Sequence, residues 1–291
     1  MKILTFKTKE SAPDHYRIGA LVSEDGLIDL TSIISESDLS EADILKCFDL
    51  DSRFHDDAKE SIATSGTIEL DRVEICSPVP RPGKIICIGL NYRDHAAESG
   101  MAIPESPVIF SKFSTCAIGP STSIAIPLGS IQTDFEAELA VIIGRRAKNV
   151  SRAEAMNYVF GYTNFNDVSA RDFQFADGQW QRGKSCDTFA PMGPFVATTD
   201  EIRDPQNLSI KFRLNGQTLQ DSSTNQMIFG VAELVEFLSR HVTLEPGDVI
   251  ATGTPPGVGF ARKPPIYLKA GDVAEVEVEG LGVLSNSVAA S

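Results

Sequence analysis

Short runs of aliphatic and β-branched residues, separated by Gly, Pro and Asn, recur along the chain and predict many short strands with few helices. In the first part of the chain, apolar runs lie at 2–7, 16–22 and 26–30, and two more polar stretches near 40–48 and 53–63 have the pattern of helices. A proline-rich linker then ends at Arg81-Pro82-Gly83. The pattern predicts a small N-terminal α+β domain over residues 1–75.

The remaining residues, 82–291, form a second predicted domain, which is α+β and rich in strands. It opens with an expected buried strand at 84–89 and a short helix that runs from an Asn91 cap to Glu98 and stops at Gly100. Asn215-Gly216 is typical of a tight hairpin turn. The other expected strands lie at 133–143, 159–166, 208–214, 248–257 (running into a turn) and 273–278, and the other helices at 151–158 and 231–240.

Acidic and apolar residues alternate at the start of the expected strand 133–143. Because side chains alternate faces along a strand, Asp134, Glu136 and Glu138 share one face, and the last two are roughly 6.5–7 Å apart. Like charges at this spacing raise each other's pKa or need a counter-charge, and a hard divalent cation is the simplest one. A solvated strand face is the alternative. The apolar run that follows favours a strand entering the core.

Two further polar groups are candidates for chemistry. His95 and Glu98 are three residues apart on the expected helix and share one face. Such pairs are often merely solvated, but a carboxylate that orients an imidazole also makes a general base able to take a proton from water. Asp167 directly follows the expected strand 159–166, where an aspartate is most often a turn or cap residue.

Composition narrows the function classes. The net charge is −14, from 40 acidic and 26 basic residues, which argues against nucleic acid and anionic membranes as partners. The N-terminal sequence lacks the pattern of a signal peptide, and the five scattered cysteines form no C-x-x-C motif, so we expect a cytoplasmic protein with reduced thiols. With four histidines in the chain, a metal site must consist mostly of oxygen ligands.

Residues 178–185, GQWQRGKS, fit the phosphate-loop pattern G-x-x-x-x-G-K-[ST]. That motif needs a helix that begins at the Lys-Ser pair, whereas Pro191, Gly193 and Pro194 follow soon after. We therefore do not expect nucleotide binding. Lys184 remains a candidate for binding an anionic substrate if it faces the carboxylates.

Together these segments resemble one family, the fumarylacetoacetate hydrolase family, in its bacterial acylpyruvase or 2,4-diketo acid hydrolase-like branch. The resemblance runs from about Lys84 to Val288, while the first eighty residues resemble the family's variable N-terminal domain only loosely. The segments that carry it are GLNYRDHAAE at 89–98, DFEAEL at 134–139, NDVSAR at 166–171, GKSCDT at 183–188 and GTP at 253–255.

The resemblance implies a mixed β-roll catalytic domain, a homodimer and a Mg²⁺ or Mn²⁺ cofactor. It implies that three carboxylates bind the metal: Glu136, Glu138 and Asp167. His95 and Glu98 correspond to a catalytic dyad, and Lys184 would support catalysis. The implied substrate contacts are Arg171, Gln174, Lys184 and Thr254. Ile88 stands where eukaryotic fumarylacetoacetases have a fourth, aspartate ligand, so that ligand is missing here.

The function expected on this basis is metal-dependent cleavage of a 2,4-dioxo acid, an acylpyruvate or a diketo-deoxy sugar acid, to pyruvate and a carboxylic acid. His95, oriented by Glu98, would activate the attacking water, and the metal would stabilise the pyruvate enolate that leaves. Oxaloacetate decarboxylation and isomerisation of a 5-carboxymethyl-2-hydroxymuconate-type diacid use the same enolate chemistry and remain alternatives. A keto-acid-binding protein without turnover is the alternative of another class.

Overall fold

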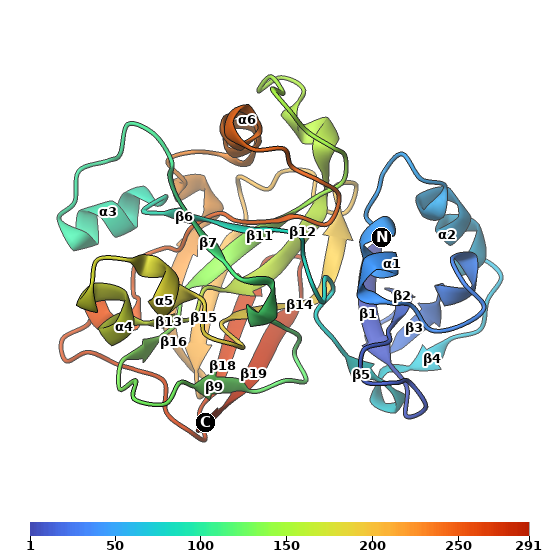
Figure 1. Ribbon diagram of the computed structural model, residues 1–291, viewed down its shortest axis with the longest axis horizontal. Helices are drawn as coiled ribbons and strands as arrows, with labels where there is room; N and C mark the ends of the chain where they lie inside the picture. Colours follow the sequence, from blue (N-terminus) through green and yellow to red (C-terminus); the bar gives the residue numbers. More distant parts are fainter. Residues whose placement is uncertain (291) are drawn as a thin grey trace.

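The computed structural model describes residues 1–290, and the side chain of Ser99 is also outside the description. The first part of the chain forms β1 (Lys2–Lys7), β2 (Arg17–Leu21), β3 (Gly26–Asp29), α1 (Glu41–Lys46), α2 (Phe54–Ile62), β4 (Ile68–Glu69) and β5 (Glu74–Ile75). These bounds confirm the strands and helices that the sequence predicts there. Figure 1 shows this part of the chain, in blue, beside the larger remainder.

The larger part contains most of the strands and four α-helices of the described chain. Its elements, in order, are β6 (Ile85–Gly89), α3 (Arg93–Ser99), β7 (Val108–Lys112), β8 (Ala117–Ile118), β9 (Ile124–Ile126), β10 (Thr133–Asp134), β11 (Ala137–Ile143), β12 (Val159–Asn166), β13 (Ser169–Ala170), α4 (Arg171–Ala176), α5 (Trp180–Lys184), β14 (Ala190–Thr198), β15 (Ser209–Leu214), β16 (Gln217–Ser223), α6 (Val231–His241), β17 (Val249–Ala251), β18 (Val273–Val278) and β19 (Val283–Ala290).

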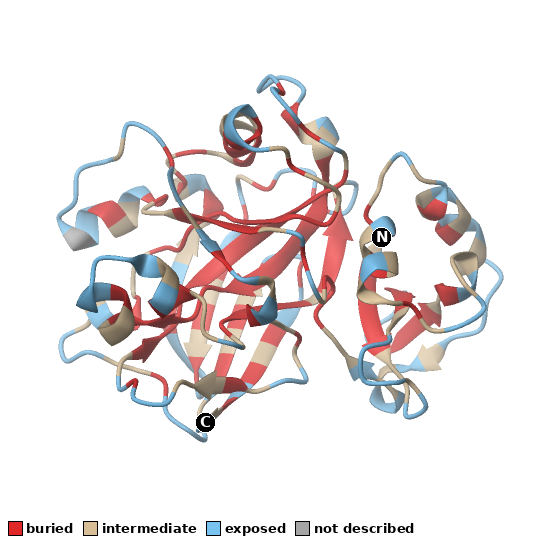
Figure 2. Ribbon diagram, in the orientation of Figure 1, coloured by how far each residue is buried: buried red, intermediate tan, exposed pale blue. Residues whose placement is uncertain are grey.

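Two packed sheets form the body of the molecule. The strands of the larger sheet run β4-β3-β2-β1-β14-β12-β11-β17-β6-β7, with β5 beside β1 and β8 beside β14, and those of the smaller run β16-β15-β18-β19-β9. Most neighbours are antiparallel, but β17 and β6 are parallel. β11 and β12 pack against β18, and Figure 2 shows these central strands buried. The predicted β-rich α+β fold with a mixed β-roll is confirmed.

The first part of the chain joins the larger sheet directly. Ile3 of β1 pairs with Val196 of β14 in antiparallel register, so the strands before residue 75 extend the sheet that carries β11 and β12. The division into domains at 1–75 and 82–291 stays a prediction. What the pairing establishes is that the two parts share a continuous hydrogen-bonded ladder.

The expected strand 133–143 is interrupted. β10 ends at Asp134 and β11 begins at Ala137, because side chains satisfy the backbone between them. The N–H of Glu136 donates to Asn166 Oδ1 at 3.1 Å, and the N–H of Ala137 donates to Gln220 Oε1 at 2.9 Å. Asp134 Oδ1 accepts the N–H of Phe135 at 2.8 Å. The prediction of one continuous strand was wrong at this point.

Two helix predictions also need correction. Helix α3 begins after Tyr92 without a side-chain cap, and Asn91 instead lies buried, donating to Phe229 O and Thr252 O. Residues 151–158 contain only a 3₁₀ turn at the end, since Ser151 Oγ bonds Glu154 Oε2 rather than capping a helix. Gly100 does end α3, with a left-handed φ of 62°.

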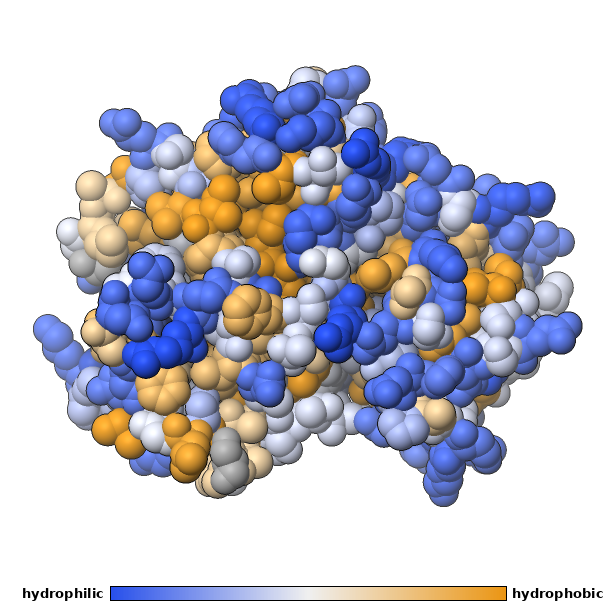
Figure 3. Space-filling view, viewed as in Figure 1, coloured by the Kyte–Doolittle hydropathy of each residue, from blue (hydrophilic) through white to orange (hydrophobic). Residues whose placement is uncertain are grey.

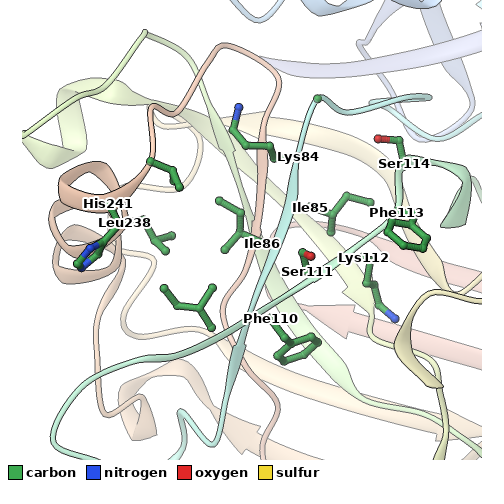
Figure 4. Close-up of a pocket in the computed structure, with 13 residues that line it drawn as sticks. Lys84, Ile85, Ile86, Phe110, Ser111, Lys112, Phe113, Ser114, Leu238 and His241 are labelled. Atoms are coloured by element: carbon green, nitrogen blue, oxygen red, sulfur yellow. The ribbon is translucent and has the colours of Figure 1, made fainter. Parts of the chain in front are cut away.

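Strand β7 is an edge of the larger sheet and borders an apolar hollow. Within the described residues β6 is its strand partner, so its outer backbone groups are open. Ile85 and Ile86 of β6, Ile109 and the neighbouring Phe113, and Leu238 of α6 line a cavity of about 420 Å³ (Figure 4). Figure 3 shows an apolar surface beneath α6. An open edge beside apolar surface favours contact with another chain.

We propose that the homodimer expected from the sequence forms through this face, with β7 of two copies pairing about a two-fold axis. Ile109→Asp and Phe113→Asp would place a buried charge in that interface and are expected to convert the dimer to monomer. Leu128→Asp, at a side chain that is 92% exposed elsewhere, is the control. Sedimentation velocity measures the outcome, and a dimer that survives both charged variants would refute the assignment of this face.

The described residues contain no helix that is both long and apolar enough to cross a bilayer.

Candidate metal and catalytic site

Strands β11 and β12 bring three predicted carboxylates together. Glu136 precedes β11, Glu138 is its second residue, and Asp167 directly follows β12. The pairing of Ala137 with Asn166 places these positions side by side, and the N–H of Asp167 donates to Glu136 O at 2.9 Å. One carboxylate oxygen from each residue lies within 4.8 Å of the others, and all three residues are buried. Three carboxylates in such a cluster are the ligand type that Mg²⁺ and Mn²⁺ prefer.

Three buried cations face this acidic triad. Lys184 Nζ lies 3.0 Å from Glu136 Oε2 and 2.8 Å from Asp167 Oδ2. Lys112 Nζ lies 2.6 Å from Asp167 Oδ1, and Arg171 Nη2 lies 2.5 Å from Glu136 Oε1. Buried charges are tolerated when each has a close partner of opposite sign. These pairs therefore explain how the Glu136 and Asp167 side chains are accommodated in the core.

Glu138 differs from the other two carboxylates. The N–H of Gly253 donates to its Oε2 at 2.8 Å, but no basic side chain among the described residues forms an ion pair with it. Burial, together with the charges of Asp167 and Glu136, raises the pKa of Glu138 well above its usual value. Burial by itself also raises the pKa of Glu136, but Lys184 and Arg171 outweigh it and lower that pKa to about 2.

The buried charges of the described chain leave one carboxylate of the triad without a cationic partner. Counting the neighbouring buried Asp134, four carboxylates (Asp134, Glu136, Glu138, Asp167) face three cations (Lys112, Arg171, Lys184), which leaves one negative charge. Glu138 is the carboxylate without a cationic partner among the described residues, and it lies beside two other carboxylates. Because an unpaired buried charge is costly, a cation bound by the triad would stabilise the site. The residues present therefore fit the expected Mg²⁺ or Mn²⁺.

Arg171 is fixed by three acceptors. It begins α4, and its Nε donates to Asp134 Oδ2 at 2.8 Å, its Nη1 to Gln174 Oε1 at 3.0 Å and its Nη2 to Glu136. Asp134 also accepts the N–H groups of Gly259 and Phe260 at 2.7 and 3.1 Å. Asp134 thus anchors both the guanidinium and the 259–261 turn. The predicted contacts Arg171 and Gln174 lie together in the cavity wall.

Lys112 and the anchoring role of Asp134 were not found by sequence reasoning. Lys112 ends β7 and also donates to Val168 O at 2.9 Å and to Lys184 O. A lysine at the end of a short apolar strand is most often exposed, so the residue type does not indicate that Lys112 is buried beside the carboxylates. Asp134 belongs to the alternating acidic pattern, but its hydrogen-bond partners Arg171 and Gly259 are 37 and 125 positions away along the chain.

The turn after β17 joins the triad to the His95–Glu98 pair. Thr254 Oγ1 donates to Ala137 O at 2.9 Å and accepts from Gln220 Nε2 at 2.9 Å. The N–H of Gly257 donates to the Glu98 carboxylate at 3.1 and 3.2 Å. Glu98 Oε2 in turn lies 3.3 Å from His95 Nδ1. The two side chains thus have the spacing expected of a carboxylate that orients an imidazole.

One cavity of about 500 Å³ contains most of the predicted site residues. Its polar wall comprises His95, Glu98, Glu136, Glu138, Arg171, Gln174, Lys184 and Thr254. Its apolar wall comprises Ile88, Leu90, Met101, Phe110, Phe175, Trp180, Phe260 and Ala261. Lys184 ends the short helix α5 rather than beginning one, and its ammonium pairs with carboxylates. This geometry agrees with the expectation that residues 178–185 are not a phosphate loop.

The family model described as fumarylacetoacetate (FAA) hydrolase C-terminal matches residues 84–289. The chain belongs to the fumarylacetoacetate hydrolase family. A relative from Rattus norvegicus, named oxaloacetate tautomerase Fahd2a, mitochondrial, is 50% identical over 222 residues, which cover 76% of this chain and 71% of the relative. Its name places that relative in mitochondria, so the cytoplasmic location of this family member stays a prediction.

Solved structures of the family match the whole chain. A fumarylacetoacetate hydrolase from Exiguobacterium antarcticum is 37% identical with a TM-score of 0.85, and each chain is covered to 100%. A maleylpyruvate hydrolase from Sphingobium sp. SYK-6, solved with manganese(II) and pyruvate, is 27% identical with a TM-score of 0.84 and the same coverage. This chain is therefore an enzyme of the fumarylacetoacetate hydrolase family, and its acylpyruvase-like branch is consistent with the second structure.

The triad makes a direct prediction for metal binding. Glu138→Gln removes a ligand charge yet keeps an oxygen for the Gly253 N–H, so the fold should survive. Mn²⁺ affinity, measured by isothermal titration calorimetry, should fall at least about 10–100-fold. That is the loss typical for residues that only hydrogen-bond to a metal ligand, and a ligand itself should matter at least as much. Glu105→Gln, at an exposed position, is the matched control and should bind Mn²⁺ like the wild type. Wild-type affinity in Glu138→Gln would remove this residue from the metal site.

Lys112 gives a stability prediction. Lys112→Met leaves the buried Asp167 with one cationic partner instead of two. Removing a partner from a buried ion pair costs roughly 3–5 kcal/mol, and we expect the free energy of unfolding in urea to fall by about the lower end of that range. Lys269→Met, on the exposed surface, should change it little. Equal stability of the two variants would show that the Lys112 pair adds nothing.

Proposed function

We propose that this protein interconverts the keto and enol forms of oxaloacetate, with a divalent cation as cofactor. The observation that carries the proposal is the single cavity that holds Glu136, Glu138 and Lys184 together with the His95–Glu98 pair. The relative at 50% identity, whose name is oxaloacetate tautomerase, supports the choice of reaction.

Tautomerisation moves a proton between C3 of oxaloacetate and the oxygen on C2, and negative charge develops on that oxygen when C3 loses its proton. A divalent cation held by Glu136, Glu138 and Asp167 would supply Lewis-acid stabilisation of this charge. Lys184 adds a fixed positive charge on the same side, because its ammonium bridges Glu136 and Asp167. The oriented guanidinium of Arg171 is suited to a substrate carboxylate.

His95 is the residue that moves the proton at C3. Its Nδ1 faces Glu98, so in the neutral ring an Nδ1–H that donates to this carboxylate leaves Nε2 as the basic nitrogen. Glu98 also stabilises the imidazolium that forms when Nε2 takes the proton. The Gly257 N–H holds Glu98 in place, so the direction of the imidazole depends on the turn after β17.

Hydrolysis of a 2,4-dioxo acid, the function expected from the sequence, is the second candidate. The same His95–Glu98 pair supports it, because hydrolysis needs a base that activates water for attack at C4 before the C3–C4 bond breaks. The maleylpyruvate hydrolase structure supports it at 27% identity. Decarboxylation of oxaloacetate and isomerisation of a hydroxymuconate-type diacid share the charge on the C2 oxygen. A general base beside the triad favours all of these enzymes over a binding protein without turnover.

Oxaloacetate and a panel of acylpyruvates separate the two candidates. With Mg²⁺ or Mn²⁺, loss of the enol's ultraviolet absorbance reports tautomerisation, and pyruvate release reports hydrolysis. We expect the kcat/KM of the wild-type protein for tautomerisation of oxaloacetate to be at least about tenfold higher than its kcat/KM for hydrolysis of any acylpyruvate. Faster pyruvate release from any acylpyruvate would reverse the order of the candidates.

His95 provides the test of mechanism. His95→Gln removes the base and leaves the triad intact, so tautomerisation should fall by roughly 10²–10⁴, the usual contribution of a positioned general base. Mn²⁺ affinity should not change, which separates loss of the base from loss of the metal. His15→Gln, which replaces an exposed histidine, is the control. If His95→Gln keeps the wild-type rate, the pair on α3 is structural.

A further inference from the structure

Four aromatic side chains from four different elements line the mouth of the catalytic cavity. Phe110 comes from β7, Phe175 from α4, Trp180 from α5 and Phe260 from the 259–261 turn. Three of them are unusually open for such side chains, since Phe175 is 57%, Trp180 37% and Phe260 36% exposed. Met101, 58% exposed, lines the same mouth. Apolar groups gathered around a cavity, unlike single exposed ones, indicate a ligand with an apolar part.

The four aromatic rings form two pairs, and one ring of each pair contacts a buried cation of the site, Lys184 or Arg171. Lys184 Nζ lies 4.9 Å from the centroid of the Phe110 ring, which meets Trp180 edge-to-face at 5.4 Å. In the other pair, the Arg171 guanidinium lies 4.4 Å from the centroid of Phe260, which meets Phe175 at 5.9 Å. A ligand whose acidic end lies at the cations therefore reaches aromatic surface directly beyond it.

Oxaloacetate leaves this surface unused. It has nine non-hydrogen atoms, carries a carboxylate at each end, and gains nothing from an aromatic wall. The cavity of about 500 Å³ is within the range of roughly 300–1,000 Å³ that holds considerably larger ligands. Aromatic ligands prefer offset or edge-to-face contacts, and the exposed Phe175 and Trp180 rings are accessible for them.

We propose that the same site accepts 2-oxo acids with an aryl group on C3, the arylpyruvates, and interconverts their keto and enol forms. This inference rests on the proposed function for its chemistry and on the aromatic mouth for its substrate. The 2-oxo acid end takes the place of the same end of oxaloacetate, and the aryl group replaces the second carboxylate and lies against the aromatic side chains. The C3–H bond breaks, His95 carries the proton, and an O–H bond forms at the C2 oxygen, so atoms and charge balance without a co-reactant.

Binding can be measured apart from turnover because Trp180 is the single tryptophan of the chain. Its fluorescence should change when an aryl group contacts the mouth. With Mg²⁺ present, 3-phenyllactate, which cannot enolise, should bind about tenfold or more tightly than lactate, which has the same acid end without the ring. Equal affinities of the two ligands would overturn the aryl site, whatever the enzyme does with oxaloacetate.

Turnover completes the test with phenylpyruvate and oxaloacetate. In Phe175→Ala, the ratio of kcat/KM for phenylpyruvate to that for oxaloacetate should fall about tenfold, and His95→Gln should reduce both. Ile131→Ala, at a side chain 82% exposed outside the cavity, is the control and should leave the ratio unchanged. An enzyme that converts oxaloacetate but not phenylpyruvate would refute the inference alone. An enzyme that binds phenyllactate tightly but converts neither acid would refute the proposed tautomerisation and the arylpyruvate activity together, leaving only the aryl-binding mouth.

Discussion

The pairing of buried carboxylates with buried cations on one side of β11 is the constraint on which the rest of the structure depends. Each partner arrives from a different place: Lys112 from β7, Glu136 and Glu138 at β11, Asp167 after β12, Arg171 from α4 and Lys184 from α5. Charges in a protein interior are costly unless their partners are held close. The core therefore cannot close without bringing these segments together, and the site forms with the fold.

The same constraint explains two helices that the hydrophobic pattern does not reveal. α4 has six residues and α5 has five, too few to be stable alone in water. Their buried faces are polar, with Arg171 and Gln174 on one and Lys184 on the other. Periodicity detects helices that bury apolar stripes, so it finds α6 and overlooks these. The break between β10 and β11 is hidden for a similar reason, since it depends on Asn166 and Gln220, which are distant in sequence.

The site residues that the sequence predicts correctly depend on spacing within one strand or helix, or belong to a family motif. Alternation along 133–143 predicted that Glu136 and Glu138 lie close together, and they do, although Glu136 lies in the break before β11. The strand 159–166 places Asp167 at its end, next to them. Helical spacing put His95 beside Glu98. Lys112 and the anchoring by Asp134 depend on contacts between remote segments, for which a single sequence has no local signal. Asn91 has the chemistry of a helix cap, but its amide is used to join the chain to Phe229 and Thr252 instead.

The register of β11 against β12 has a consequence for how this site can change. Side chains alternate faces, so a slip of one residue would turn Glu138 away from Asp167 and present Leu139 in its place. Substitutions can adjust the aromatic mouth step by step, because its side chains come from four separate elements: a strand, a turn and two short helices. An insertion or deletion within the strand pair instead removes the carboxylates from the site at once. We therefore expect changes of chain length to be tolerated around the aromatic mouth and not within the β11–β12 pair.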